Sequence, residues 1–159
     1  MADSKNKFAA DAMLGRLARW LRFLGCDVVY DSRLDDNAIL FISLSEGRTL
    51  LTKDRELASR AKKSGYLVLG ENTKAQVAEI VNKFDIEPAI AKERCPVCNG
   101  WIVAVPREEI RQEIPEYTSL IHSSFGRCES CGKVFWEGSH VSRAKHNLIE
   151  YLSSSDENK

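Results

Sequence analysis

Hydrophobic and polar positions follow two alternating rhythms between Phe8 and about Phe84. Short apolar runs, typical of buried strands, are separated by longer segments with the spacing of amphipathic helices, and glycine or aspartate stands at the joints. The pattern predicts strands at 7–11, 27–30, 49–52 and 66–69, and helices at 14–24, 37–45, 55–63 and 74–84. One helix between each pair of strands indicates a mainly parallel, doubly wound α/β sheet covered on both faces.

Three glycines, Gly25, Gly47 and Gly65, stand one or two residues after predicted helices. Helices often end in a residue with left-handed backbone conformation, which glycine adopts without the steric cost that a side chain brings. We therefore expect each of the three to form a left-handed helix cap.

The alternation of helix and strand stops at Asp85, and 85–88 is expected to form a linker. From Arg94 onward cysteine, aromatic residues and proline dominate, and no sustained helical period returns before a last helix at 140–152. The polar segment 153–159 is expected to fray. The pattern thus predicts three parts, an α/β domain at 1–88, a cysteine-rich domain at 89–139, and a helix with its tail at 140–159.

Composition narrows the functional classes. The chain has 159 residues, of which 43% are hydrophobic and 29% charged, and it contains no run of eighteen apolar residues that could span a bilayer. Basic and acidic residues balance at 23 each, so no strong overall field draws the protein to a polyanion, and any contact with nucleic acid must be local. The first residues lack the pattern of an export signal, and we expect a cytoplasmic protein.

Four of the five cysteines form two Cys-x-x-Cys pairs, Cys95 with Cys98 and Cys128 with Cys131. In a reducing compartment such pairs indicate a metal site rather than disulfides, and four thiolates make a closed, structural zinc site. The 29 residues between the pairs exceed the usual separation of roughly fifteen to twenty. The segment that includes 106–115 must therefore form a hairpin extension or an embellished loop.

Other interpretations of these cysteines are a redox dithiol or four thiols without a role. A segment this short has little hydrophobic core of its own, however, and needs a bound metal ion to stabilise its fold. His122 and His140 could also bind metal. Because four cysteines already complete a tetrahedron, we expect both histidines to be ordinary side chains.

Aspartates stand where several predicted strands end. Asp11 and Asp54 follow two strands, and Asp35 and Asp36 begin the second helix. The carboxyl ends of parallel strands share one edge of a sheet, where ligands and chemistry gather. Carboxylates that converge there could hold one or two hard cations for phosphodiester cleavage. The competing interpretation is helix capping, which suits Asp35 and Asp54 better than Asp11.

The first predicted helix separates its leucines from its arginines. Leucines at 14, 17, 21 and 24 form one apolar stripe, and Arg16, Arg19 and Arg22 lie on the other side at a spacing of three. The arginines begin just after Asp11, so they could hold a phosphate backbone near a metal. The alternative is a solvated helix face that forms surface ion pairs.

Four blocks in order, FAADAMLGRLARWLRFLGCDVVY, LLTKDRELASRA, RCPVCNG and CESCGKVFWEGSH, resemble the Mut-seven C-terminal RNase family. The similarity runs from about Phe8 to His140. The resemblance implies a PIN-like nuclease domain over 1–88, a zinc ribbon over 89–139, and ribonuclease activity that depends on magnesium or manganese.

Carried over by position, the resemblance places the catalytic acids on Asp11, Asp36 and Asp54, with Asp35 as the alternative to Asp36. It implies that the Thr52 hydroxyl supports the site, and we group Thr52 with Arg16 and Arg19 as substrate-binding residues. A fourth acid often stands near the end of the next strand in such nucleases. The sequence offers Glu71 or Asn72 there.

These patterns together predict a metal-dependent ribonuclease that acts on single-stranded RNA, with zinc-bound cysteines at Cys95, Cys98, Cys128 and Cys131 holding a ribbon that helps to seat the substrate. The alternative is a noncatalytic module that binds RNA or protein, in which the acids only cap helices. A phosphotransfer domain with one aspartate as nucleophile is less favoured, because no second acidic signature or paired lysine is evident.

Overall fold

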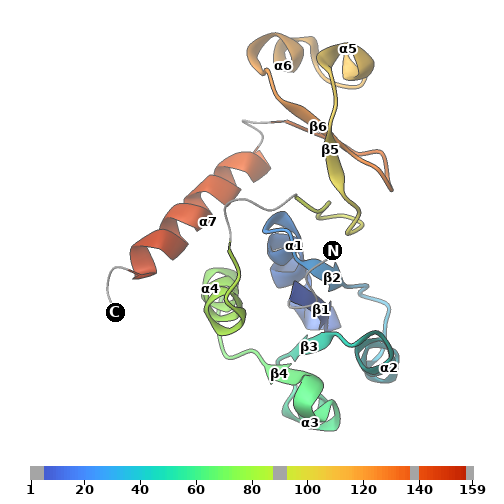
Figure 1. The fold of residues 1–159 in the computed structure, drawn as a ribbon, viewed down its shortest axis with the longest axis vertical. Helices are drawn as coiled ribbons and strands as arrows, with labels where there is room; N and C mark the ends of the chain where they lie inside the picture. The colour runs from blue at the N-terminus through green and yellow to red at the C-terminus, as the bar shows by residue number, and fades with distance from the viewer. Residues whose placement is uncertain (1–5, 88–92, 137–139, 157–159) are drawn as a thin grey trace. The chain divides into compact units, whose positions relative to one another are not determined.

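The computed structural model describes residues 6–87, 93–136 and 140–156, and the chain divides into two compact units, Met1–Ala91 and Lys92–Lys159 (Figure 1). The expected boundary at residue 88 lies outside the described residues. The first unit is a mixed α/β fold and the second contains a small antiparallel sheet with the four paired cysteines, so the fold class expected from the sequence is confirmed.

The sheet of the first unit has four strands in the order β2-β1-β3-β4, and every neighbouring pair is parallel. Its strands are β1 (Lys7–Ala10), β2 (Asp27–Val29), β3 (Thr49–Thr52) and β4 (Gly65–Leu67). The chain passes from β1 to β2 on one side and then crosses to β3 on the other side. The direction of winding therefore reverses at β1, as in a doubly wound sheet.

Two layers of helices cover this sheet. The helices are α1 (Gly15–Phe23), α2 (Asp36–Glu46), α3 (Arg55–Arg60) and α4 (Thr73–Phe84), with short 3₁₀ turns η2 (Ala12–Leu14) and η3 (Lys62–Ser64). Helix α1 contacts α4, and α2 contacts α3. Because parallel strands are joined by right-handed crossovers, a reversal in strand order places the helices on opposite faces of the sheet.

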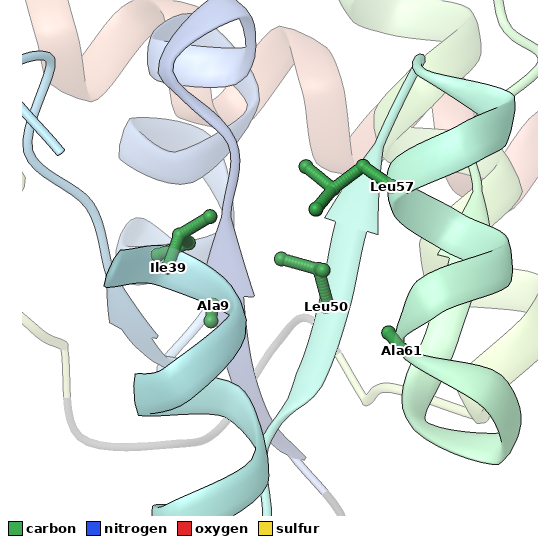
Figure 2. Close-up of a cluster of buried hydrophobic side chains, with 5 residues drawn as sticks. All are labelled: Ala9, Ile39, Leu50, Leu57 and Ala61. Atoms are coloured by element: carbon green, nitrogen blue, oxygen red, sulfur yellow. The ribbon is translucent and has the colours of Figure 1, made fainter. Parts of the chain in front are cut away.

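Each layer packs on its own set of alternating strand residues. Ala9 and Leu50 lie in register on β1 and β3, and Ile39, Leu57 and Ala61 pack against them, as Figure 2 shows. Successive strand residues point to opposite faces, so Phe8 faces the other layer. Its ring meets that of Phe84 on α4 edge to face, with 5.1 Å between the ring centroids.

The expected glycine cap is present at Gly47, which ends α2 with φ 63°. At Gly65 the prediction of a left-handed cap is wrong, because its backbone is extended, with φ −89° and ψ 136°. Glycine is required there for another reason. A Cβ atom at this position would lie 2.2 Å from the backbone oxygen of Ala58, so the close approach of β4 to α3 excludes any side chain.

The second unit has a three-stranded antiparallel sheet in the order β5-β6-β7. Its elements are β5 (Ile102–Ala104), α5 (Arg107–Ile110), α6 (Glu116–Ile121), β6 (Phe125–Cys128), β7 (Val134–Trp136) and α7 (His140–Asp156). The long segment between the cysteine pairs thus contains β5 and most of β6, and the loop between these strands carries two short helices that were not expected from the sequence. Its buried residues, Ile110, Ile114 and Phe125, form a small apolar cluster.

The last helix runs four residues beyond the predicted end at 152, so part of the segment expected to fray is helical. Residues 157–159 lie outside the described chain. None of the described helices combines the length and the apolar character that crossing a bilayer requires.

Candidate active site and candidate zinc centre

The carboxyl ends of β1 and β3 lie side by side, at the point where the winding of the sheet reverses. Ala10 pairs with Leu51, and one residue further the backbone N–H of Asp11 donates to the carbonyl oxygen of Leu51 at 3.0 Å. The crevice beyond such a reversal is where open α/β sheets bind ligands. Asp11 and Thr52 therefore occupy the edge of the sheet that suits a functional site best.

Thr52 connects the two acids that flank this crevice. Its hydroxyl donates to Oδ2 of Asp11 at 2.8 Å and accepts from the backbone N–H of Asp54 at 3.0 Å. The Thr52 side chain is 0% exposed and Asp11 only 7% exposed. Since a buried polar group without a partner costs about 1–3 kcal/mol, this pair of bonds fixes both acids relative to β3.

Capping does not explain Asp11. It stands at the N-cap position of η2, but its side chain makes no capping hydrogen bond there. Its second oxygen, Oδ1, accepts no hydrogen bond from any residue that the structure describes. A largely buried carboxylate with one free oxygen at the end of a strand is an unusual choice for structure alone, because burial of a charge is costly.

Asp54 does cap a helix, as the structural interpretation expected. Its Oδ1 accepts the backbone N–H of Leu57 at 3.0 Å in the first turn of α3. The residue is exposed, and Oδ2 has no hydrogen-bond partner within the described chain. The cap therefore holds one oxygen in place and leaves the other open to a ligand.

The two candidates for the remaining acid behave differently. Asp35 caps α2, since its Oδ1 accepts the Ala38 N–H at 2.8 Å. Asp36 is exposed, and no described residue bonds to its carboxylate. Within the described ranges, however, the structure does not gather Asp36 with Asp11 and Asp54 into a group of three metal-ligating atoms. The Thr52 hydroxyl links the Asp11 carboxylate to the backbone of Asp54, and no hydrogen bond links Asp36 to either residue within the described chain.

The loop after β4 is anchored by a residue that sequence reasoning missed. One oxygen of Glu79, Oε1, accepts from the Tyr66 hydroxyl and the Leu69 N–H, both at 2.9 Å, and Oε2 accepts the Gly70 N–H at 2.7 Å. No motif marks Glu79, which is one of several polar residues on α4. Burial, and then this hydrogen bond to the Glu79 carboxylate, raise the pKa of Tyr66 to about 12.

The two candidates for a fourth acid lie in this loop. Asn72 caps α4 by accepting the Ala75 N–H at 3.0 Å, so its side-chain oxygen is engaged. Glu71 is exposed, and its carboxylate bonds to no other described residue. Of the two, Glu71 is the one with a free carboxylate.

The arginines of α1 divide into two groups. Arg22 is only 4% exposed, and its Nε and Nη2 donate to the Val28 carbonyl oxygen at 3.0 and 2.9 Å. The expectation that it could hold a phosphate is therefore wrong, because its guanidinium joins α1 to β2. Arg16 and Arg19 are exposed and pair with no other described residue, so both can meet an anion.

The four paired cysteines converge in the second unit. Their sulfur atoms all lie within 4.8 Å of one another, with 3.7 Å from Cys95 to Cys131 and 3.4 Å from Cys98 to Cys128. A tetrahedral zinc ion with Zn–S bonds of about 2.3 Å sets its sulfurs ~3.8 Å apart. The spacing therefore fits a zinc ion, and the cluster suggests a zinc ribbon. His122 is not part of it.

Local surroundings distinguish the four thiols. Burial raises the pKa of Cys95 to about 12. Burial also acts to raise the pKa of Cys128, but backbone N–H groups of Cys131 and Ser130 point at its sulfur and lower that pKa to about 7. The Gly100 N–H donates to the sulfur of Cys98 at 3.4 Å, but burial outweighs this bond and raises the pKa of the Cys98 thiol. Backbone donors of this kind stabilise thiolates, the form that binds metal.

The sheet edge that carries Asp11, Thr52 and Asp54, called the acid edge below, and the four-cysteine cluster both fall inside one family match. The model of the Mut7-C RNAse domain matches residues 6–148, which is most of the chain. The chain belongs to the Mut7-C RNAse domain family. Membership indicates a nuclease-like function, and it confirms the resemblance drawn from the sequence blocks. No curated protein and no solved structure matched the chain.

Proposed function

We propose that this Mut7-C RNAse domain protein is a ribonuclease that hydrolyses phosphodiester bonds of single-stranded RNA with the help of magnesium or manganese. The observation that favours this function most is the shared hydroxyl of Thr52, which ties the carboxylate of Asp11 to the backbone of Asp54 at the reversal point of the sheet. Each of the two acids keeps one oxygen that no described residue uses.

This donor set suits a hard cation. Mg²⁺ prefers oxygen ligands, keeps several waters, and is commonly bound by one or two carboxylates together with substrate phosphates. Asp11 and Asp54 would hold the ion, and the exposed carboxylate of Asp36 would orient a water or complete the shell. When bound, the cation supplies an activated water and neutralises charge on the leaving phosphate.

The remaining residues would bind and orient the RNA. Arg16 and Arg19 are free to contact phosphates, whereas the fully buried Thr52 positions the acids and does not touch substrate itself. We further propose that the 1–88 nuclease domain cuts, that the 89–139 zinc ribbon helps to seat the strand, and that the protein works in the cytoplasm. Binding through phosphates should weaken as the salt concentration rises.

A noncatalytic binding module is the second candidate, and one observation favours it. Asp35 and Asp54 both cap helices, which is the role that acids would have in a protein without catalysis. That role leaves Asp11 without an explanation.

One experiment separates the two. Labelled single-stranded RNA is incubated with manganese and with the natural protein, Asp11→Asn, Asp54→Asn or Asp35→Asn. Asparagine caps helices as well as aspartate does, so the last two variants keep α3 and α2 intact. We expect Asp11→Asn and Asp54→Asn to lose at least about 100-fold in rate, within the range of general metal and acid–base contributions, and Asp35→Asn to cleave normally.

Asp36→Asn extends the same series to the acid that the structure leaves apart. A loss of rate in this variant, with Asp35→Asn unaffected, would assign the role to Asp36. Equal cleavage by all variants, or no cleavage by the natural protein, would refute the proposed ribonuclease activity.

A further inference from the structure

A cavity of about 590 Å³ opens beside the acid edge of the first unit. The β1–α1 connection forms one wall, and the β4–α4 loop with the start of α4 forms the other. Its lining includes Met13, Arg16, Tyr30, Glu71, Thr73 and Gln76. Ala12, the residue next to Asp11, also lines it. The volume falls in the range of pockets that bind small molecules and cofactors.

The first wall is held by Tyr30. Its hydroxyl donates to the carbonyl oxygen of Ala12 at 3.1 Å, which ties the end of β2, where Tyr30 follows, to the residue after Asp11. A Cβ atom on Gly15 would lie 2.5 Å from that hydroxyl oxygen, so the phenol packs directly against bare backbone. The position of this wall is therefore linked to the position of the acid.

The second wall is held at Gly70. Its N–H donates to Glu79, and its carbonyl oxygen accepts from Lys53 Nζ at 2.9 Å and from Gln76 Nε2 at 3.1 Å. Lys53 stands between Thr52 and Asp54 in the sequence, so the acid edge itself fixes this loop. Bonds from two residues of α4 and from the β3–α3 turn hold the loop, and the cavity is consequently preformed rather than created by a ligand.

The chemistry of the lining is mixed. Arg16 offers a guanidinium, whose planar donors match the oxygens of a phosphate, and Glu71 offers a carboxylate, which only accepts hydrogen bonds. Neither bonds to another described residue. An anion and a group with N–H donors are the two partners that these side chains lack.

We propose that this cavity binds one nucleotide of the RNA, next to the phosphate that is cut, and prefers guanine. The Arg16 guanidinium donates hydrogen bonds to the phosphate of that nucleotide, and the Glu71 carboxylate accepts hydrogen bonds from its base. Only guanine presents a ring N–H beside an amino group, and this pair matches the two oxygens of a carboxylate. The assignment to RNA rests on the proposed function, because it supplies the neighbouring scissile phosphate.

Binding of single nucleotides tests the cavity apart from catalysis. Calorimetry on the full chain without added divalent cation would compare 5′-GMP with 5′-UMP. A charge-assisted hydrogen bond contributes about 1.5–3 kcal/mol, so we expect GMP to bind roughly tenfold or more tightly than UMP. Glu71→Gln should remove most of that preference, and Glu56→Gln, an exposed acid on α3 away from the cavity, should leave it unchanged.

The phosphate contact has a matched control outside the cavity. Arg16 and Arg55 are both exposed, but only Arg16 lines the cavity. We expect Arg16→Gln to weaken GMP and UMP alike by about tenfold, the loss of one charged hydrogen bond, and Arg55→Gln to have no effect on either. Equal affinity for GMP and UMP, or equal effects of the two arginine variants, would overturn the proposal.

Cleavage then separates this proposal from the function on which it rests. If the natural protein binds GMP selectively but never cuts RNA, the proposed nucleotide site is supported and the proposed ribonuclease activity is refuted. If it cuts RNA with product ends that show no enrichment of guanosine and binds no nucleotide, the ribonuclease activity is supported and the proposed nucleotide site is refuted.

Discussion

The hydroxyl of Thr52 donates a 2.8 Å hydrogen bond to Oδ2 of Asp11. Thr52 ends β3, Asp11 directly follows the neighbouring strand β1, and the two residues are 41 positions apart in the chain. The same hydroxyl accepts the N–H of Asp54. A single buried side chain thus sets the geometry between two acids that sequence alone leaves far apart. The role of Thr52 is to position, and this makes it a sharp test of the site.

Thr52→Val keeps the branched shape and removes the hydroxyl. It leaves the Asp11 carboxylate and the Asp54 N–H each without a buried partner, so we expect the free energy of unfolding to fall by about 1–3 kcal/mol. Cleavage at equal folded fraction should fall as well, since the acids lose their common anchor. Urea titration and RNA cleavage rates measure the two effects.

The neighbouring Thr49 provides the control for this variant. Thr49 begins the same strand, is only partly buried, and its side chain bonds to no other described residue. We expect Thr49→Val to change neither quantity and Thr52→Ser to restore most of the cleavage. A Thr52→Val protein with natural activity would show that the hydroxyl does not organise the site.

Removal of one cysteine ligand should release the metal. We expect the natural protein to contain one zinc ion per chain and Cys98→Ser to contain almost none, because structural zinc supplies about 10–16 kcal/mol to small domains that fold around it. Metal content by mass spectrometry and the fluorescence of Trp101 and Trp136, both in the second unit, report the loss. Cys26→Ala, which changes a buried cysteine in the first unit, should keep its zinc.

Long elements, in which the hydrophobic spacing repeats several times, were predictable from the sequence, and short elements were not. The segment 74–84 matches α4 to within one residue, because three turns of helix repeat the apolar spacing several times. Helices α5 and α6 have only four and six residues, too few to show a period. A usable signal was present, since Pro106 and Pro115 each precede a helix with glutamate in its first turn.

For the site, sequence reasoning identified residue types and missed their surroundings. Helical spacing placed Arg22 on the polar side of its helix. The end of α1 lies against β2, however, and the buried guanidinium of Arg22 donates to the Val28 carbonyl oxygen. The three contacts of Glu79 likewise depend on where α4 meets the β4 strand and loop. Such contacts arise from tertiary packing, which a single sequence does not encode locally.

Two arginines of α1 should therefore differ in what their loss affects. Arg22→Gln leaves a buried carbonyl oxygen underbonded, and we expect stability to fall by about 1–3 kcal/mol with no change in RNA affinity of the folded protein. Arg19→Gln should do the reverse and reduce the salt dependence of RNA binding by about one phosphate contact. Urea titration and fluorescence anisotropy at several salt concentrations measure both. An Arg22→Gln protein with natural stability would contradict the structural role.

Stability at high pH should depend on Tyr66. Burial, and then the hydrogen bond to Glu79, raise the pKa of its phenol from 10 to about 12, so the folded state favours the protonated form. The resulting contribution to the free energy of unfolding is fully present below pH 10, the pKa in the unfolded chain, and is lost as the pH rises through 12. We expect Tyr66→Phe to be less stable than the natural protein at pH 8 and the gap between the two to narrow at pH 11. Urea titration at both pH values measures the gap, and absorbance at the tyrosinate band follows the ionisation directly. Other groups that titrate in this range affect the natural protein and Tyr66→Phe alike, so their contributions cancel in the difference. A difference in unfolding free energy that stays constant from pH 8 to pH 11 would show that the folded state does not raise the pKa of this phenol.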